Sequence, residues 1–136
     1  GGDSSAVTDR LVAGVTVITG NSQAFAALKI SGEVVTWGAV QSGGDSSAVA
    51  DRLTASVTSI TGNGLAFVAL KDSGEVVTWG DAESGGESSA VADRLVAGVT
   101  VVTSNDGAFA AVKDAGEVVT WGLAARGGDF SSVADR

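Results

Sequence analysis

The sequence predicts a mainly β repeat protein in which small antiparallel sheets stack on one another. Three observations lead to this fold class: a period of 42 residues, short β-branched segments joined by glycine turns, and strands that are apolar on both faces. A repeat this short cannot bury a core of its own, so each copy must be completed by a neighbour.

The period shows at both ends of the repeat unit. Gly-Gly-Asp-Ser-Ser at residues 1–5 returns at 43–47 and, with Glu for Asp, at 85–89, while Glu-Val-Val-Thr-Trp-Gly at 33–38 returns twice at the same step. This spacing divides the 136 residues into three units and a partial fourth: 1–42, 43–84, 85–126 and 127–136. A chain that stops inside a new copy, and has no initiating methionine, favours an excerpt of a longer array.

Each unit is expected to open with a short helix. Residues 3–11 begin with side chains suited to helix capping and then place Val7 and Leu11 four residues apart. A helix of one or two turns is not stable alone, so it must lie on an apolar surface.

Three strands should follow in each unit, at 15–19, 24–29 and 33–37 in the first copy. The glycine of Ser31-Gly32 supplies the positive φ that a tight hairpin needs between the last two strands. Alternate strand residues point to opposite sides, and both sides are apolar or small: Phe25 and Ala27 on one, Ala24 and Leu28 on the other. Sheets that are apolar on both faces lie between other layers.

These segments resemble the repeat of the RCC1-like β-propellers. The resemblance rests on Val-Thr-Val-Ile, Ala-Phe-Ala-Ala-Leu-Lys and Ser-Gly-Glu-Val-Val-Thr-Trp-Gly, within residues 15–38, 57–80 and 99–122. It implies blades of three to four antiparallel strands with a short helix per repeat, and a habit of binding other proteins. The family's units are usually longer, and its frequent histidine is replaced here by Ala24, Ala66 and Ala108. No residues for the founding member's nucleotide-exchange activity can be mapped onto this chain.

A β-solenoid, in which each unit forms one coil, is the alternative fold. Strands would then pair between units, whereas a propeller pairs them within each unit. The glycine hairpins favour antiparallel pairing within the unit.

The composition argues against several functional classes. A net charge of −8 with dispersed basic residues disfavours nucleic acid and anionic membrane as partners. The sequence contains no histidine, cysteine or tyrosine, so the common nucleophile and metal-ligand sets are missing and we expect neither an enzyme nor a cofactor. Gly-Gly-Asp-Ser-Ser offers too few oxygen ligands for calcium, and a turn with a helix cap explains it more simply.

Aromatic and charged residues recur at fixed places in the unit. The aromatic residues are expected to form the structural core, with a carbohydrate-binding surface as the alternative: Phe25, Trp37, Phe67, Trp79, Phe109 and Trp121. The recurring Asp-Arg dipeptide is expected either to be a solvated helix end or to form inter-repeat ion pairs or an Arg-to-carbonyl clamp: Asp9, Arg10, Asp51, Arg52, Asp93 and Arg94. Lys29 and Glu33, with their equivalents, are expected to pair across the hairpin.

The copies differ most in their loops, where binding surfaces are commonly built. The candidate binding-loop residues are Asn21, Gln23, Asn63, Leu65, Asn105 and Asp106. The function predicted first is a non-enzymatic structural or interaction protein whose blades self-associate into a closed ring or a filament, or form part of a longer array. Its partners would be other copies, further repeats of the array, or another protein bound through the loops. A lectin-like module using the loops or tryptophans is the alternative.

Overall fold

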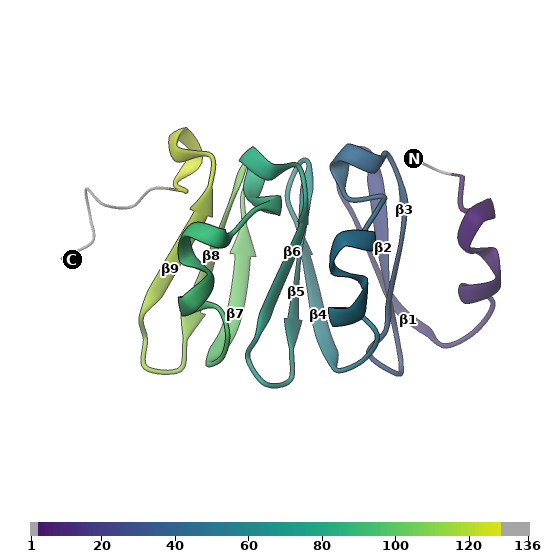
Figure 1. The fold of residues 1–136 in the computed structure, drawn as a ribbon, viewed down its shortest axis with the longest axis horizontal. Coiled ribbons are helices and arrows are strands. Elements are labelled where there is room, and N and C mark those ends of the chain that lie inside the picture. The colour runs from purple at the N-terminus through teal and green to yellow at the C-terminus, as the bar shows by residue number, and fades with distance from the viewer. Residues whose placement is uncertain (1–2, 129–136) are drawn as a thin grey trace.

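The computed structural model describes residues 3–128, which form three small sheets arranged in a row (Figure 1). Each sheet contains three strands: β1 (Val15–Gly20), β2 (Ala24–Lys29) and β3 (Val34–Gly38); β4 (Val57–Gly62), β5 (Ala66–Lys71) and β6 (Val76–Gly80); β7 (Val99–Ser104), β8 (Ala108–Lys113) and β9 (Val118–Gly122). The expected strands are therefore present in every unit. Each sheet has three strands, the lower of the two expected numbers.

Consecutive strands pair antiparallel within each sheet, in the orders β1-β2-β3, β4-β5-β6 and β7-β8-β9. Phe25 lies opposite Trp37, and the same register recurs in the other two sheets. All strand pairing among the described residues is thus within a unit, as a propeller requires and a solenoid does not.

The first strand of each sheet contains a β-bulge that the sequence pattern did not predict. The register shifts between Val15 and Val17, and the hydroxyl of the intervening Thr16 donates to the carbonyl oxygen of Leu28 at 3.1 Å. Thr58 and Thr100 make the equivalent hydrogen bond in the other sheets. A bulge increases the local twist of a strand.

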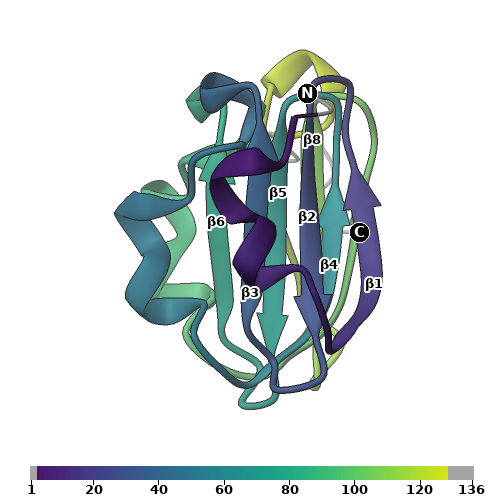
Figure 2. The same ribbon diagram turned by 90° about the vertical axis from the view of Figure 1, so that its right-hand side faces the viewer.

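The predicted helices are short 3₁₀ helices: η1 (Ser5–Arg10), η3 (Ser47–Arg52), which is kinked at Val49, and η5 (Ser89–Arg94). Viewed along the row, the sheets lie one behind another, and η1 lies across β3 (Figure 2). The serine before each helix makes no capping hydrogen bond through its side chain. Instead a carboxylate two residues before the first helical residue accepts that residue's N–H: Asp3 from Ser5, Asp45 from Ser47 and Glu87 from Ser89.

A tight turn connects the last strand of each sheet to the next unit: η2 (Val40–Ser42), η4 (Ala82–Gly86) and η6 (Ala124–Arg126). The first two turns bring Gly43 and Gly85 against the following sheet with φ of +99° and +103°. A Cβ at Gly43 would lie 2.5 Å from the Phe67 ring, and one at Gly85 would lie as close to Phe109. Glycine is required there by conformation and by space.

The core lies between the sheets, in two apolar clusters. One joins the first sheet to the second and the other joins the second to the third. No helix among residues 3–128 is long and apolar enough to cross a membrane.

Candidate functional site

Each sheet has two different apolar faces. The leading face looks toward the preceding sheet and, in the second sheet, consists of Phe67, Ala69, Val77 and Trp79. The trailing face looks toward the following sheet and, in the first sheet, consists of Ala24, Ala26, Leu28 and Val34. These eight residues lie in one cluster, so a trailing face always meets a leading face. The equivalent residues repeat this contact between the second and third sheets.

A tryptophan on the leading faces of the second and third sheets is hydrogen-bonded to the turn that precedes its sheet. The indole Nε1 of Trp79 donates to the Gly43 carbonyl oxygen at 3.1 Å, and that of Trp121 donates to Gly85 at the same distance. Each indole also contacts the phenylalanine of its own sheet, with ring centroids 5.6 Å apart: Trp79 stacks on Phe67, and Trp121 is tilted by 30° to Phe109. Both tryptophans are 4% exposed, so they belong to the core and offer no aromatic surface to a sugar.

Backbone hydrogen bonds also run from sheet to sheet. Val34 N–H donates to Leu53 in the segment before the second sheet, and Val57 N–H donates back to Gly32; the distances are 2.9 and 3.2 Å. At the other end of the strands, Ser22 N–H donates to Gly64, and Gly64 N–H donates to Asp106. These bonds fix the position of each sheet on its neighbour.

Among the described residues, no further sheet covers the trailing face of the third sheet. Val118 is 39% exposed, while its equivalents Val34 and Val76 are 2% and 3% exposed. Val112 is 37% exposed, against 7% for the equivalent Leu28. This end of the row therefore presents an apolar sheet face to solvent.

The leading face of the first sheet is also partly uncovered. Phe25 and Trp37 are half-buried, although the same positions in the other sheets are buried. Leu11 and Val15 are half-buried too, whereas Leu53 and Val57 are 2% and 5% exposed. Ala27 and Val35, at the centre of this face, are buried.

Two glycines mark the contacts that the third sheet leaves open. Gly127 has the same conformation as Gly43, with φ of +98°, yet a Cβ there would meet no described atom within 4 Å. Gly116 is open in the same sense, while a Cβ at the equivalent Gly32 would lie 2.4 Å from Ser56 N. The backbone at this end therefore already has the shape that receives a sheet elsewhere in the row.

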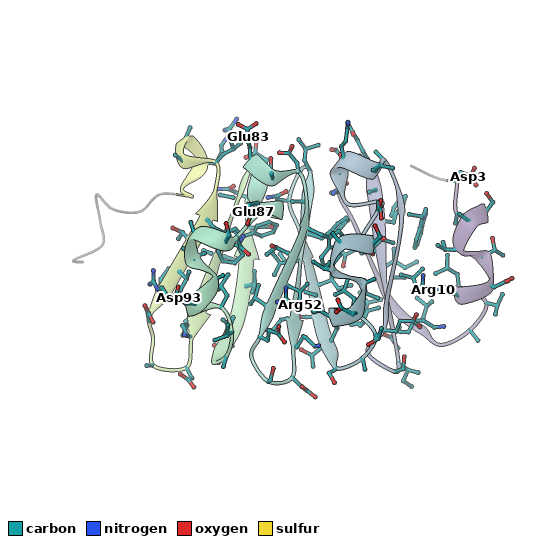
Figure 3. The ribbon with its side chains drawn as sticks, in the orientation of Figure 1. Asp3, Arg10, Arg52, Glu83, Glu87 and Asp93 are labelled. Atoms are coloured by element: carbon teal, nitrogen blue, oxygen red, sulfur yellow. The ribbon has the colours of Figure 1, made fainter. Side chains whose placement is uncertain are left out.

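The recurring arginines pair inside their own unit. Arg10 contacts Glu33, Arg52 contacts Glu75, and Arg94 contacts Glu117 through Nε and Nη2. Each also donates to the carbonyl oxygen after that glutamate, that of Val34, Val76 or Val118. Figure 3 shows Arg10 and Arg52 at corresponding places in successive units. The expected inter-repeat pair is therefore corrected: guanidinium and carboxylate join the helix to the hairpin of one unit, because the helix lies on its own last strand.

The aspartates beside these arginines, Asp9, Asp51 and Asp93, lie exposed on the helices. Lys29 Nζ lies 3.9 Å from Glu33 Oε1, so the predicted cross-hairpin pair forms in the first unit. The equivalent lysines, Lys71 and Lys113, form no ion pair with Glu75 and Glu117 among the described residues, so the prediction was wrong for these two units. Glutamate was not predicted as the arginine's partner, although Arg and Glu keep a constant spacing in every copy.

The loop asparagines are structural. Asn63 accepts the N–H groups of Leu65 and Ala66 through Oδ1 and donates from Nδ2 to the Ser84 carbonyl oxygen. Asn21 and Asn105 make the equivalent bonds, so each asparagine joins the first hairpin loop to the turn after the sheet. Their constancy among variable neighbours was the signal that sequence reasoning missed.

The remaining loop candidates lie at the surface beside these asparagines. Gln23 accepts the Ser42 hydroxyl, Asp106 lies 3.7 Å from Arg126, and Leu65 is half-buried. Their role in binding stays a prediction. In the described part of the chain, no group of three or more acidic side chains could hold a metal ion.

Comparison with solved structures assigns the architecture. Prp20p from Saccharomyces cerevisiae superposes with a TM-score of 0.59 at 16% identity, over 80% of this chain and 31% of that one. Human WBSCR16 matches with the same TM-score and identity, over 79% of this chain and 33% of that one. The chain has the blade fold of the RCC1-like β-propellers. Each sheet thus has the fold of a propeller blade.

A plant receptor has the same blades: the ectodomain of the Physcomitrella patens receptor kinase CR4 matches with a TM-score of 0.53 at 19% identity, over 88% of this chain and 30% of that one. The chain spans about a third of the length of these solved chains. Neither a family model nor a curated protein matches the sequence.

Proposed function

We propose that this protein is a non-enzymatic interaction scaffold whose two end faces bind further blades of its own kind. The blades could belong to other copies of the chain or to further repeats of one array. The single observation that carries the proposal is that the two open faces are the two halves of a contact that the chain forms twice internally.

The physical drive for this association is burial of apolar surface. Val112, Val118, Phe25 and Trp37 are exposed or half-buried, while their internal equivalents lie in the core. Burying a fully exposed valine or phenylalanine side chain contributes about 1.5–3 kcal/mol, so each of these partly exposed side chains would contribute only a fraction of that amount. Because the two faces differ, their contact is not self-complementary and generates either a closed ring or a filament. Two copies would give six blades and three copies nine.

Protein binding fits what one solved relative does. Prp20p has binding properties toward Gsp1p and histones, and the same protein, yeast RCC1, has also been solved bound to Kap60. A lectin-like function has no comparable support, because Trp79 and Trp121 are buried.

Size-exclusion chromatography with light scattering over a wide concentration range tests the proposal. We expect the mass to rise from the 13.3 kDa of one chain with concentration. Added salt should strengthen the association, since copies carrying −8 each repel one another. Negative-stain microscopy then separates rings from filaments. A single species of one chain's mass at every concentration and salt would overturn the proposal.

A further inference from the structure

We infer that two copies join head to tail: the trailing face of the third blade of one copy receives the leading face of the first blade of the next, in the geometry of the internal contacts. This inference rests on the proposed self-association and adds to it the head-to-tail orientation of the two copies and the atoms that form the contact.

The backbone groups that join the internal blades repeat at a step of 42 residues, and the last members of each series have no such partner among residues 3–128. Val34 N–H donates to Leu53 and Val76 N–H to Leu95, so Val118 N–H is the next donor in the series. Its acceptor by the same step is the carbonyl oxygen of Leu11 of the second copy.

A second series runs in the opposite direction. The carbonyl oxygens of Gly32 and Gly74 accept from Val57 and Val99 at 3.2 and 3.1 Å. Gly116 is the next acceptor, and no described atom lies within 4 Å of its Cβ position. Val15 of the second copy carries the matching N–H.

The hydrogen bond from tryptophan to the turn glycine supplies a third pair. Gly43 and Gly85 accept from Trp79 and Trp121, and Gly127 already has their left-handed conformation. Trp37 of the second copy is the equivalent donor, stacked on Phe25 with ring centroids 5.4 Å apart. The Gly127 carbonyl oxygen of one copy and the Trp37 indole of the next are therefore the acceptor and the donor of one hydrogen bond.

These series give the contact a direction. A pair of trailing faces would bring Gly116 and Gly127 together with no aromatic ring to receive. A pair of leading faces would bring two Trp37 indoles together, and neither would have a turn carbonyl to accept its N–H. A head-to-tail contact uses every donor and every acceptor of these series once. Such a contact between two different surfaces is a heterologous association.

Complementation between two variants tests the polarity. Val118→Glu places a carboxylate on the open trailing face, and Leu11→Glu places one at the equivalent contact of the leading end. Both residues are exposed or half-buried in the single chain, so each variant should fold. Sedimentation of each variant alone should give a single chain, and an equimolar mixture should give a 1:1 pair through the two intact faces.

The possible failures differ from one another. A wild-type chain that stays single overturns both the proposed function and the inference. A wild type that associates, together with one variant that still pairs with itself, overturns the polarity alone, because that result requires a symmetric contact. A mixture that remains single chains also overturns it.

Gly127→Asn and Trp37→Ala provide a second pair if either charged variant fails to unfold cooperatively. Asparagine tolerates the left-handed conformation of Gly127 and fills the open space. This pair should give the same complementation.

Discussion

The indole nitrogen of Trp79 donates a 3.1 Å hydrogen bond to the carbonyl oxygen of Gly43, 36 residues earlier in the chain. Gly43 lies in the turn that leaves the first blade, while Trp79 lies on the last strand of the second. The bond thus joins two blades at a point where the backbone has a positive φ and no room for a side chain. Stability of the row should depend on this contact.

Trp79→Ala removes the ring and the hydrogen bond together. Since Trp79 is 4% exposed, the free energy of unfolding should fall by about 3–5 kcal/mol. Trp79→Phe keeps most of the packing and should lose about 1 kcal/mol. Urea denaturation measures both, and a loss below about 1 kcal/mol for the alanine variant would show that the indole is not in the core.

Gly43→Ala should destabilise the chain by more than backbone strain alone. Its Cβ would lie 2.5 Å from the Phe67 ring, and overpacking adds about 1–3 kcal/mol to the roughly 1–2 kcal/mol of the left-handed conformation. Gly127→Ala is the matched control, because its φ is nearly equal but its surroundings are open. Thermal unfolding at dilution should show the larger loss for Gly43, and equal losses would contradict the close approach to Phe67.

Asn63→Ala should cost about 2–3 kcal/mol, because it leaves the N–H groups of Leu65 and Ala66 and the carbonyl of Ser84 without their partner. Asn105 makes the same bonds at the exposed end of the row. Water can replace its bonds there, so Asn105→Ala should cost less. Chemical denaturation measures the loss in the free energy of unfolding for both variants. A larger loss for Asn105→Ala than for Asn63→Ala would contradict the role given to burial.

Stability should decline when the solution becomes acidic. Hydrogen bonds from Ser5 and Ser89, mainly from their backbone N–H, lower the pKa of Asp3 and Glu87, and the hydroxyl and backbone of Ser47 lower the pKa of Asp45. A carboxyl with a lowered folded-state pKa stabilises the fold above its unfolded-state pKa, and this contribution is lost as the pH falls through the folded value.

The pH window for this loss therefore lies below the ordinary values of 3.8 for aspartate and 4.5 for glutamate. The effect should be small, because all three carboxyls are exposed. A triple variant with Asp3→Asn, Asp45→Asn and Glu87→Gln should flatten the acid side of the stability profile. An unchanged profile would show that other carboxyls control it.

The sequence predicted the blade well because its signals are local and repeated. Residues 24–29 match β2 from end to end, and the two-sided apolar pattern correctly placed the sheets against one another. The three strands of each unit pair with each other as the glycine hairpins indicated. Repetition strengthened each of these signals, because a chance pattern does not return three times.

The contacts between segments were harder to predict. Arg52 pairs with Glu75 because η3 lies across β6, and no periodicity reveals how a helix crosses a strand. The bulge at Thr16 depends on one hydroxyl reaching one carbonyl. The exposure of Val118 and the open surroundings of Gly116 and Gly127 follow only from the three-dimensional arrangement.

The fluorescence of Trp37 tests the central claim most directly. In a Trp79→Phe, Trp121→Phe chain, Trp37 is the single indole, and it is half-buried until a second copy covers it. We predict that its emission shifts to shorter wavelength as concentration rises, and that adding Val118→Glu abolishes this shift. An emission maximum that stays constant while the measured mass increases would contradict the account, because the copies would then be joined through another surface.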